Sequence, residues 1–280
     1  MDSLEPGIYH GIPFDTYLAL PYASNSLLGR LAITPAHALL GGGDTQATNL
    51  GRACHAYVLE GESALKEQFA VGPGVGKKKK EEKAVWDKFM ETVGDRSVIK
   101  ESEYFDIISM DRAIHCNPTA ADWLEDGESE ITIIWDAVDF DGSPIGVRCK
   151  GRIDRLPSNY KDMIVDLKTT ENAHEKSFAY SIKKYGYHRQ AAMYMHALKL
   201  LVPSLNVEKF GFIAVEKTAP FRTECYTLTS PCQTLMDGFS DYVGLVKKYK
   251  LCRDMDFFPN YVNAGAQELF VINEEVTTWQ

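Results

Sequence analysis

Two charged residues at alternate positions of one predicted strand offer the clearest chemistry in this sequence. The run 164–170 reads Ile-Val-Asp-Leu-Lys-Thr-Thr, a composition typical of a β-strand. Residues two apart point to the same face, so Asp166 and Lys168 project together while Val165 and Leu167 face a core. Carboxylate oxygens are the ligands that Mg²⁺ prefers, and a nearby lysine can orient water or offset charge on a phosphoryl oxygen. On its own, the pattern is equally typical of a solvated strand face.

A second carboxylate precedes this strand. The run 151–156, Gly-Arg-Ile-Asp-Arg-Leu, also predicts a strand and contains Asp154. The residues Pro157-Ser158-Asn159 favour a turn that folds the two strands into a hairpin. Such a hairpin would bring Asp154 to Asp166 and Lys168, so that two carboxylates and one ammonium group meet.

Capping residues and hydrophobic periodicity predict the elements that must position these groups. Helices are expected over 25–31, 50–59 (capped by Asn49), 104–115, 175–184 and 186–198, with others opening at Pro35, Lys77 and Pro231. Strands are expected over 130–135, 145–150, 151–156, 164–170, 209–216 and 222–228. Residues 8–22 read as an extended lead-in, and the chain from Asp254 reads as an irregular tail. Helices followed by an antiparallel meander, a helix and further strands indicate an α/β fold with a mixed sheet.

The composition is that of an ordinary soluble globular protein, with 280 residues, 45% of them hydrophobic and 25% charged. No apolar run approaches the roughly 18 residues that span a bilayer, and the first residues lack the regions of a signal peptide. We therefore expect a cytoplasmic protein with no membrane partner. The net charge of −9 argues mildly against bulk nucleic-acid affinity, but acidic metal ligands contribute to that sum and basic residues can line one groove.

The six cysteines are scattered and form no Cys-x-x-Cys pair. This spacing disfavours a zinc knuckle, and nothing in it suggests an iron–sulfur cluster. Free, mostly buried thiols in a reducing compartment are expected.

Three weaker features each allow a structural and a functional interpretation. Gly51 and His55 are four apart and share a helical face, as do Gln190 and Tyr194; a buried, satisfied histidine is the structural alternative for His55. The lysine run is either a solvated helix start or a basic segment that follows a phosphate backbone. It comprises Lys77, Lys78, Lys79 and Lys80.

Taken in order, these residues resemble the motifs of the PD-(D/E)XK nuclease superfamily. The resemblance is closest to the RecB-type branch and its RecE-like (exonuclease VIII-like) phage exonucleases. It covers roughly residues 8–230. It rests on the segments Thr34-Pro35-Ala36-His37, Leu50–Glu60, Lys150–Asp154, Val165–Thr170 and Tyr187–Tyr194, together with Glu130.

The resemblance implies a single nuclease domain over 1–280, with a restriction-endonuclease-like core at about 45–230, a mixed β-sheet flanked by helices, and a helical lead-in. It also implies two Mg²⁺ (or Mn²⁺) ions. Asp154, Asp166 and the Leu167 carbonyl would bind metal, and Glu130 and His55 would help hold the second ion. Glu128 remains an alternative to Glu130.

The remaining implied roles belong to the lysine and to residues after it. Lys168 would position the attacking water and stabilise the phosphorane, and Gln190 would orient Lys168 or the phosphate. Tyr194 would line the DNA path. The other residues expected to bind DNA are His188, Arg189, Arg152, Lys77, Lys78, Lys79 and Lys80.

The implied activity is an exonuclease that digests linear double-stranded DNA 5′ to 3′ and leaves 3′ overhangs for a single-strand annealing recombinase, in a bacterial host with a phage or prophage gene. A ring-shaped trimer or tetramer would place Lys183, Lys184, Arg189 and the lysine run around a channel. One alternative is a single-strand nuclease of the Cas4-like type, whose four-cysteine cluster this sequence lacks. Another is a non-catalytic DNA-end-binding protein that retained the fold.

Overall fold

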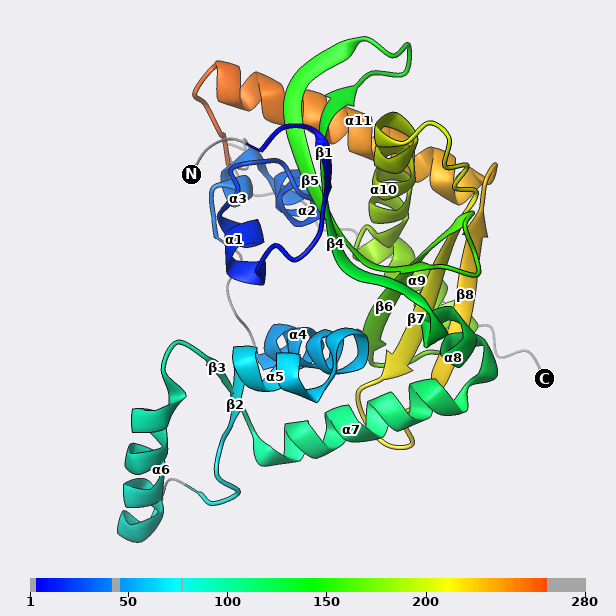
Figure 1. Ribbon diagram of the computed structural model, residues 1–280. Coiled ribbons are helices and arrows are strands. Elements are labelled where there is room, and N and C mark those ends of the chain that lie inside the picture. The colour runs from blue at the N-terminus through cyan, green and yellow to red at the C-terminus, as the bar shows by residue number, and fades with distance from the viewer. Residues whose placement is uncertain (1–3, 42–45, 77, 261–280) are drawn as a thin grey trace, which may run out of the picture.

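The computed structural model describes residues 4–41, 46–76 and 78–260. Its centre is a six-stranded sheet in the order β1-β4-β5-β6-β7-β8, shown in Figure 1. The strands are β1 (Gly7–Tyr9), β4 (Gly127–Val138), β5 (Pro144–Pro157), β6 (Met163–Thr170), β7 (Lys209–Glu216) and β8 (Thr223–Thr229). Only β6 and β7 pair in parallel, so the sheet is mixed, as the sequence predicts. β6 is a central strand, and the alternative of a solvated strand face is therefore wrong.

Helices cover both faces of the sheet. One face packs against α2 (Asn25–Ile33), α9 (Glu175–Lys184), α10 (Tyr187–Leu201) and α11 (Gln233–Asp254). The other packs against α4 (Gln46–Glu60), α5 (Glu62–Gln68), α7 (Glu101–Cys116) and α8 (Pro118–Glu125). β6 serves both layers, because Ile164 packs in the first core while Val165 and Leu167 pack in the second. Among the described helices, none is both long and apolar enough to cross a bilayer.

A separate arm leaves this body between α5 and α7. It contains β2 (Phe69–Val71), α6 (Lys80–Val93) and β3 (Ser97–Ile99), and the two strands pair in parallel as a small second sheet. Figure 1 shows α6 standing away from the body, at the lower left. Val85 and Met90 are exposed on this helix.

Most predicted elements lie within two or three residues of the observed ones. Helix α4 is an exception because it begins at Gln46, which puts Asn49 inside the helix and not at its cap. The lead-in is the larger error: residues 8–22 contain β1 and a short helix, α1 (Phe14–Ala19). A further short helix, α3 (Pro35–Ala38), begins where Thr34-Pro35 predicts it. Lys77 and the tail beyond residue 260 lie outside the described residues.

A buried lysine fixes α1 to the sheet. The Lys150 side chain on β5 donates hydrogen bonds from Nζ to the carbonyl oxygens of Tyr17 (2.7 Å), Leu18 (2.9 Å) and Leu20 (2.7 Å). These carbonyls lie at the C-terminal end of α1, where a helix leaves its acceptors unpaired and carries partial negative charge. One ammonium group therefore satisfies three acceptors and sets the position of α1.

We expect Lys150→Met to lower the free energy of unfolding by about 3 kcal/mol, because three hydrogen bonds to a charged donor are lost, two of them to carbonyls of the buried residues Tyr17 and Leu20. Urea unfolding measures this change. The matched control is Lys248→Met, whose lysine is exposed on α11 and should change stability by less than about 0.5 kcal/mol. Equal stability of the two variants would show that α1 is held by other contacts.

Candidate active site

Strands β5 and β6 diverge where their acidic residues face each other. Within the described residues, the two strands share one ladder pair, Arg155 with Val165. Beyond it, the Leu167 amide donates to Asp154 Oδ2 at 2.9 Å, so a side chain takes the place of a ladder partner. The divergence opens the sheet at its centre and leaves room beside the Asp154 carboxylate.

Three potential metal ligands gather in this opening. His55 from α4, Glu130 from β4 and Asp154 from β5 place one ligand atom each within 4.8 Å of one another. His55 Nδ1 lies 3.5 Å from Asp154 Oδ2. The three residues line a cavity of about 200 Å³. Two carboxylates and an imidazole are a donor set that divalent cations accept.

Glu130 reaches the group through an unusual backbone conformation. Its φ is +56°, in the left-handed region that is uncommon for residues other than glycine. It lies between the pairs Ser129–Arg155 and Ile131–Ile153, and therefore opposite Asp154. Such conformations concentrate at functional sites, where the surrounding structure holds them in place. The alternative glutamate, Glu128, is outside the group: its side chain is 63% exposed and lies 3.2 Å from His10.

Asp166 and Lys168 form a buried pair beside this group. Asp166 is 1% exposed, and Lys168 Nζ lies 2.5 Å from its Oδ2. Gln190 Nε2 donates to Asp166 Oδ1 at 2.6 Å. Asp166 is thus paired with protein groups through both oxygens and is not a member of the three-ligand group. Gln190 was expected to orient Lys168 or a phosphate, but it contacts Asp166.

The proton affinities of these groups reflect burial and crowded negative charge. Burial, followed by the charge of Asp166, raises the pKa of Asp154 to about 8. Burial also raises the pKa of Glu130, with Asp154 as the next cause, and lowers the pKa of His55. Burial acts to lower the pKa of Lys168, but the charges of Asp166 and Asp154 outweigh it and hold that pKa above its ordinary value. The residues therefore fit a divalent cation. A bound cation would offset the repulsion between the carboxylates, which bound protons offset when no metal is present.

A second cavity, of about 740 Å³, lies on the other side of Lys168. Its lining includes Lys168, Lys183, Lys184 and Arg189. Arg189 is 6% exposed and donates from Nε to Asn25 Oδ1 at 2.8 Å. Basic side chains around one cavity are the kind of surface that accepts phosphate groups.

Two more of the residues predicted to contact DNA, besides Arg189, are buried inside the protein. His188 is buried, with Nδ1 3.1 Å from the Ile182 carbonyl oxygen and Nε2 3.1 Å from Asp241 Oδ2. Tyr194 is also buried, and its ring fills the space that a side chain at Gly151 would occupy, 2.6 Å from an ideal Cβ. The structure gives both residues packing roles, although both border the basic cavity.

Arg152 is likewise engaged. Its Nε donates to Glu130 Oε2, its Nη1 donates to the Ile12 carbonyl at 2.8 Å, and its backbone N–H donates to the Tyr194 hydroxyl at 3.3 Å. The guanidinium therefore orients a candidate ligand through its Nε, and its Nη1 is held by a backbone carbonyl.

The lysine run lies away from the site. Lys78 and Lys79 directly precede α6 and Lys80 opens it, so all three are exposed on the projecting arm (Figure 1). Lys77 lies outside the described residues. Contact between these lysines and the same DNA stretch that reaches Lys168 would need a long path over the body.

Sequence reasoning missed two side chains at the cavity of the three ligands. The Arg52 guanidinium lies 4.7 Å from the ring centroid of Phe14, and Arg152 approaches the same ring at 5.8 Å. Arg52 could have been found, because it is three residues before His55 on one helix and shares its face. Phe14 could not, because nothing local links the start of α1 to ligands that lie about 40 or more than 100 residues further along the chain.

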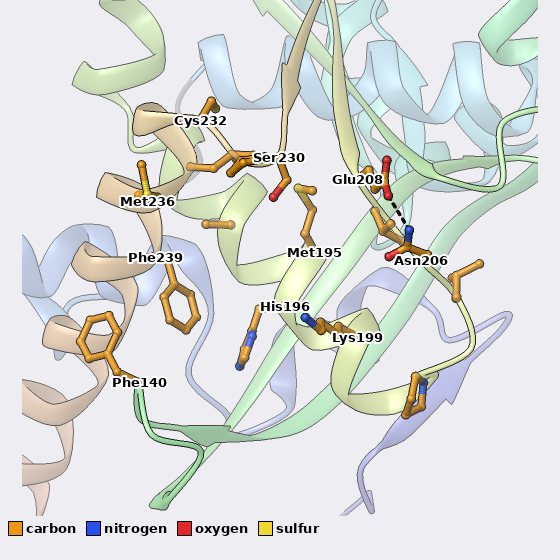
Figure 2. A pocket seen from close by; sticks show the side chains of 16 residues that line it. Phe140, Met195, His196, Lys199, Asn206, Glu208, Ser230, Cys232, Met236 and Phe239 are labelled. Carbon is orange, nitrogen blue, oxygen red and sulfur yellow. Dashed lines mark hydrogen bonds between the residues drawn. The ribbon is translucent and has the colours of Figure 1, made fainter.

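Another large cavity lies away from this site. A cavity of about 700 Å³ lies between α10, α11 and the β4–β5 hairpin, and its lining is mainly apolar. Figure 2 shows the side chains that line it. Phe140 and Phe239 lie on one side and Met195 on another, with His196 between them. The only carboxylate in the lining, Glu208, is hydrogen-bonded to Asn206. This cavity therefore has no cluster of carboxylates comparable with the one at the site.

Comparisons with known proteins bear on the fold and the family of this chain. The crystal structure of a protein provisionally named as an exonuclease, from Eubacterium rectale, matches with a TM-score of 0.64 and 12% identity, and the match covers 97% of this chain and 100% of that one. A phage-related exonuclease from Haemophilus somnus 129PT matches with a TM-score of 0.32 and 14% identity over 51% of this chain and 69% of that one, too weak a likeness to carry an argument. No curated protein matches the chain.

The first likeness shows the fold. The family comes from a separate match, which extends over residues 24–270 and so includes every strand of the site. The chain belongs to the family described as a PDDEXK-like domain of unknown function (DUF3799), within the PD-(D/E)XK nuclease superfamily.

Proposed function

We propose that this protein is a metal-dependent nuclease that hydrolyses phosphodiester bonds at the ends of linear double-stranded DNA. The observation that carries the proposal is the adjacency of the His55–Glu130–Asp154 group to the buried Asp166–Lys168 pair. Membership of the PDDEXK-like family supports a nuclease, and the Eubacterium rectale protein's name supports an exonuclease.

The carboxylates would hold Mg²⁺ or Mn²⁺. His55, Glu130 and Asp154 supply side-chain donors, and the Leu167 carbonyl and Asp166 would complete two sites. When bound, such ions activate water and offset charge on phosphoryl oxygens. Arg152 keeps the Glu130 carboxylate oriented, while the Leu167 amide does the same for Asp154.

Lys168 would act as a charged donor. Because the neighbouring carboxylates raise its pKa, the side chain keeps its proton at neutral pH and is unsuited to serve as a base. It can instead hydrogen-bond to the attacking water or to a non-bridging oxygen as negative charge develops there. Gln190 would keep Asp166 in place, so that Lys168 is aimed correctly.

Two alternatives are less well supported. Cas4-like nucleases have a cluster of four cysteines, whereas no cysteine belongs to a potential metal-binding group anywhere in the described chain. A non-catalytic DNA-end-binding protein would have no use for several carboxylates buried close together, which destabilise the fold through mutual repulsion. The 5′-to-3′ polarity, the 3′ overhangs and the annealing recombinase as partner follow from the RecE-like resemblance and are proposed with it.

The first test of the function uses linear duplexes labelled at either the 5′ or the 3′ end, with Mg²⁺. We expect digestion that requires a free end, proceeds from the 5′ side and leaves a 3′ single strand. Lys168→Ala should lower turnover by at least about a hundredfold while duplex binding persists, because an oriented donor to the reacting phosphate is lost. Near-normal turnover of Lys168→Ala would refute the assigned role, and normal turnover of Asp154→Asn would refute the site.

The second prediction concerns metal and pH. The folded-state pKa of Asp154 lies above its unfolded value, so the metal-free protein binds an extra proton and loses this stabilisation as the pH rises towards 8. Metal competes with that proton, so Mn²⁺ should raise the melting temperature more at pH 8 than at pH 6. Differential scanning fluorimetry measures both effects.

Two matched variants distinguish metal binding at this site from a general effect of losing a carboxylate. Asp154→Asn should raise the melting temperature of the metal-free protein at pH 8 and remove most of the Mn²⁺ effect, whereas Glu128→Gln should keep it. An unchanged Mn²⁺ effect in Asp154→Asn would place the metal elsewhere.

The third prediction is a ring-shaped homo-oligomer of three or four subunits. An acidic monomer would hold a polyanion weakly at physiological salt, whereas a closed ring can gather basic residues around one channel. The exposed apolar residues of α6, which stand clear of the body, support a contact between subunits. Light scattering at micromolar concentration should give three or four times the chain mass, and digestion should continue after an excess of unlabelled duplex is added. A monomer whose digestion stops at that addition would contradict the ring.

A further inference from the structure

An aromatic and basic strip lies on the surface where α9 meets α10. Tyr180 is 68% exposed and Tyr185 is 54% exposed, which is unusual for side chains with large apolar rings. Lys184 lies between them, with Nζ 5.8 Å from the Tyr180 ring centroid and 5.2 Å from that of Tyr185. Both distances are within the range of cation–π contact, so the three side chains form one continuous surface.

The strip continues inward to the site. The ring centroids of Tyr185 and Tyr187 are 5.7 Å apart, and Lys168 Nζ lies 4.8 Å from the Tyr187 centroid. An unbroken series of rings and ammonium groups thus runs from the catalytic lysine to the outer surface. No residue of this series beyond Lys168 has a role in the proposed reaction.

The local fold holds the strip in place. Tyr180 and Lys184 are four apart on α9 and therefore neighbours on one helical face. Tyr185 ends that helix, and Gly186 turns the chain into α10 with a φ of +68°. A side chain at Gly186 would lie 2.5 Å from Arg189 Nη2, so a larger residue there would have to displace that guanidinium.

The electrostatics around the strip favour a polyanion. Lys184 and Tyr185 line the cavity of about 740 Å³ that Lys168 borders. Five lysines and arginines line it against a single carboxylate, Asp241. The protein as a whole has a net charge of −9, so this concentration of positive charge is local. Exposed rings between ammonium groups match the alternation of bases and phosphates in nucleic acid.

We propose that Tyr180, Lys184 and Tyr185 form a stacking platform for a single strand of nucleic acid. Its position next to Lys168 gives it a use only if the proposed nuclease function is correct. The rings would stack on unpaired bases, whose faces are available only outside a duplex, and Lys184 would contact the backbone phosphates. The platform would therefore guide one strand to or from the site and leave duplex affinity to other surfaces.

The test measures binding without cleavage. A fluorescent oligothymidylate is titrated with the full-length protein in EDTA, and anisotropy gives the dissociation constant. We expect the double variant Tyr180→Ala/Tyr185→Ala to bind about tenfold or more weakly, because each lost stacking contact reduces affinity by roughly that factor. Tyr180→Phe/Tyr185→Phe keeps the rings and should bind within about twofold of the unaltered protein.

Two further controls isolate stacking. Phe105→Ala removes a ring that is 58% exposed on α7 and should leave binding unchanged. An abasic oligonucleotide of equal length should bind the unaltered protein and the double alanine variant equally weakly, and blunt duplex should bind both equally well.

The proposal is overturned if the unaltered protein does not bind oligothymidylate, if it binds the abasic strand as tightly, or if the alanine and phenylalanine variants behave alike. Cleavage does not enter these measurements. A platform without nuclease activity, or a nuclease without the platform, would therefore be told apart.

Discussion

Negative charge buried at the centre of a sheet is the constraint around which this structure is arranged. Asp154 and Asp166 are both buried, on adjacent strands, where water cannot screen their repulsion. Each has a specific compensation: the Leu167 amide for Asp154, and Lys168 with Gln190 for Asp166. Those partners come from β6 and α10, so the charges are tolerated only when the whole layer is assembled. Buried charges of this kind, with a pKa as strongly shifted as that of Asp154, are typical of functional sites, which agrees with the proposed function.

The same arrangement accounts for two different cavities beside the central strands. The three-ligand group faces a small cavity, closed by α1 and α4, where a hard cation and a few water molecules fit. Lys168 faces the larger basic cavity, bordered by α2, α9 and α10, where a phosphate backbone fits. The Asp166–Lys168 pair separates the two. The two sides therefore differ in the sign of their charge, with carboxylates on one side and basic side chains on the other.

How much the sequence predicts depends on how local the signal is. Strand alternation correctly placed Asp166 beside Lys168, and the turn after Pro157 brought Asp154 to them, because both follow from short-range geometry. The face of α10 that carries Gln190 was also predictable. The contact of Gln190 with Asp166 was not predictable, because it depends on how α10 packs on β6.

The remaining predictions failed because they concern residues whose burial depends on elements distant in the sequence. α10 is enclosed by the sheet, α2 and α11, so even His188 and Arg189 are buried, and composition alone would not place charged residues there. Likewise α1 has only six residues, too few for a periodic pattern, and its position depends on the distant Lys150.

Three residues on one face of strand β5 each position or form part of the site. Lys150, Arg152 and Asp154 are two apart, so they project together: the first fixes α1, the second orients Glu130, and the third belongs to the ligand group. Insertion or deletion of a single residue before Lys150 within the strand would turn all three to the opposite face at once. In evolution, length changes in this part of the chain should therefore be confined to the hairpin around Asp141, and the strand itself should vary only by substitution.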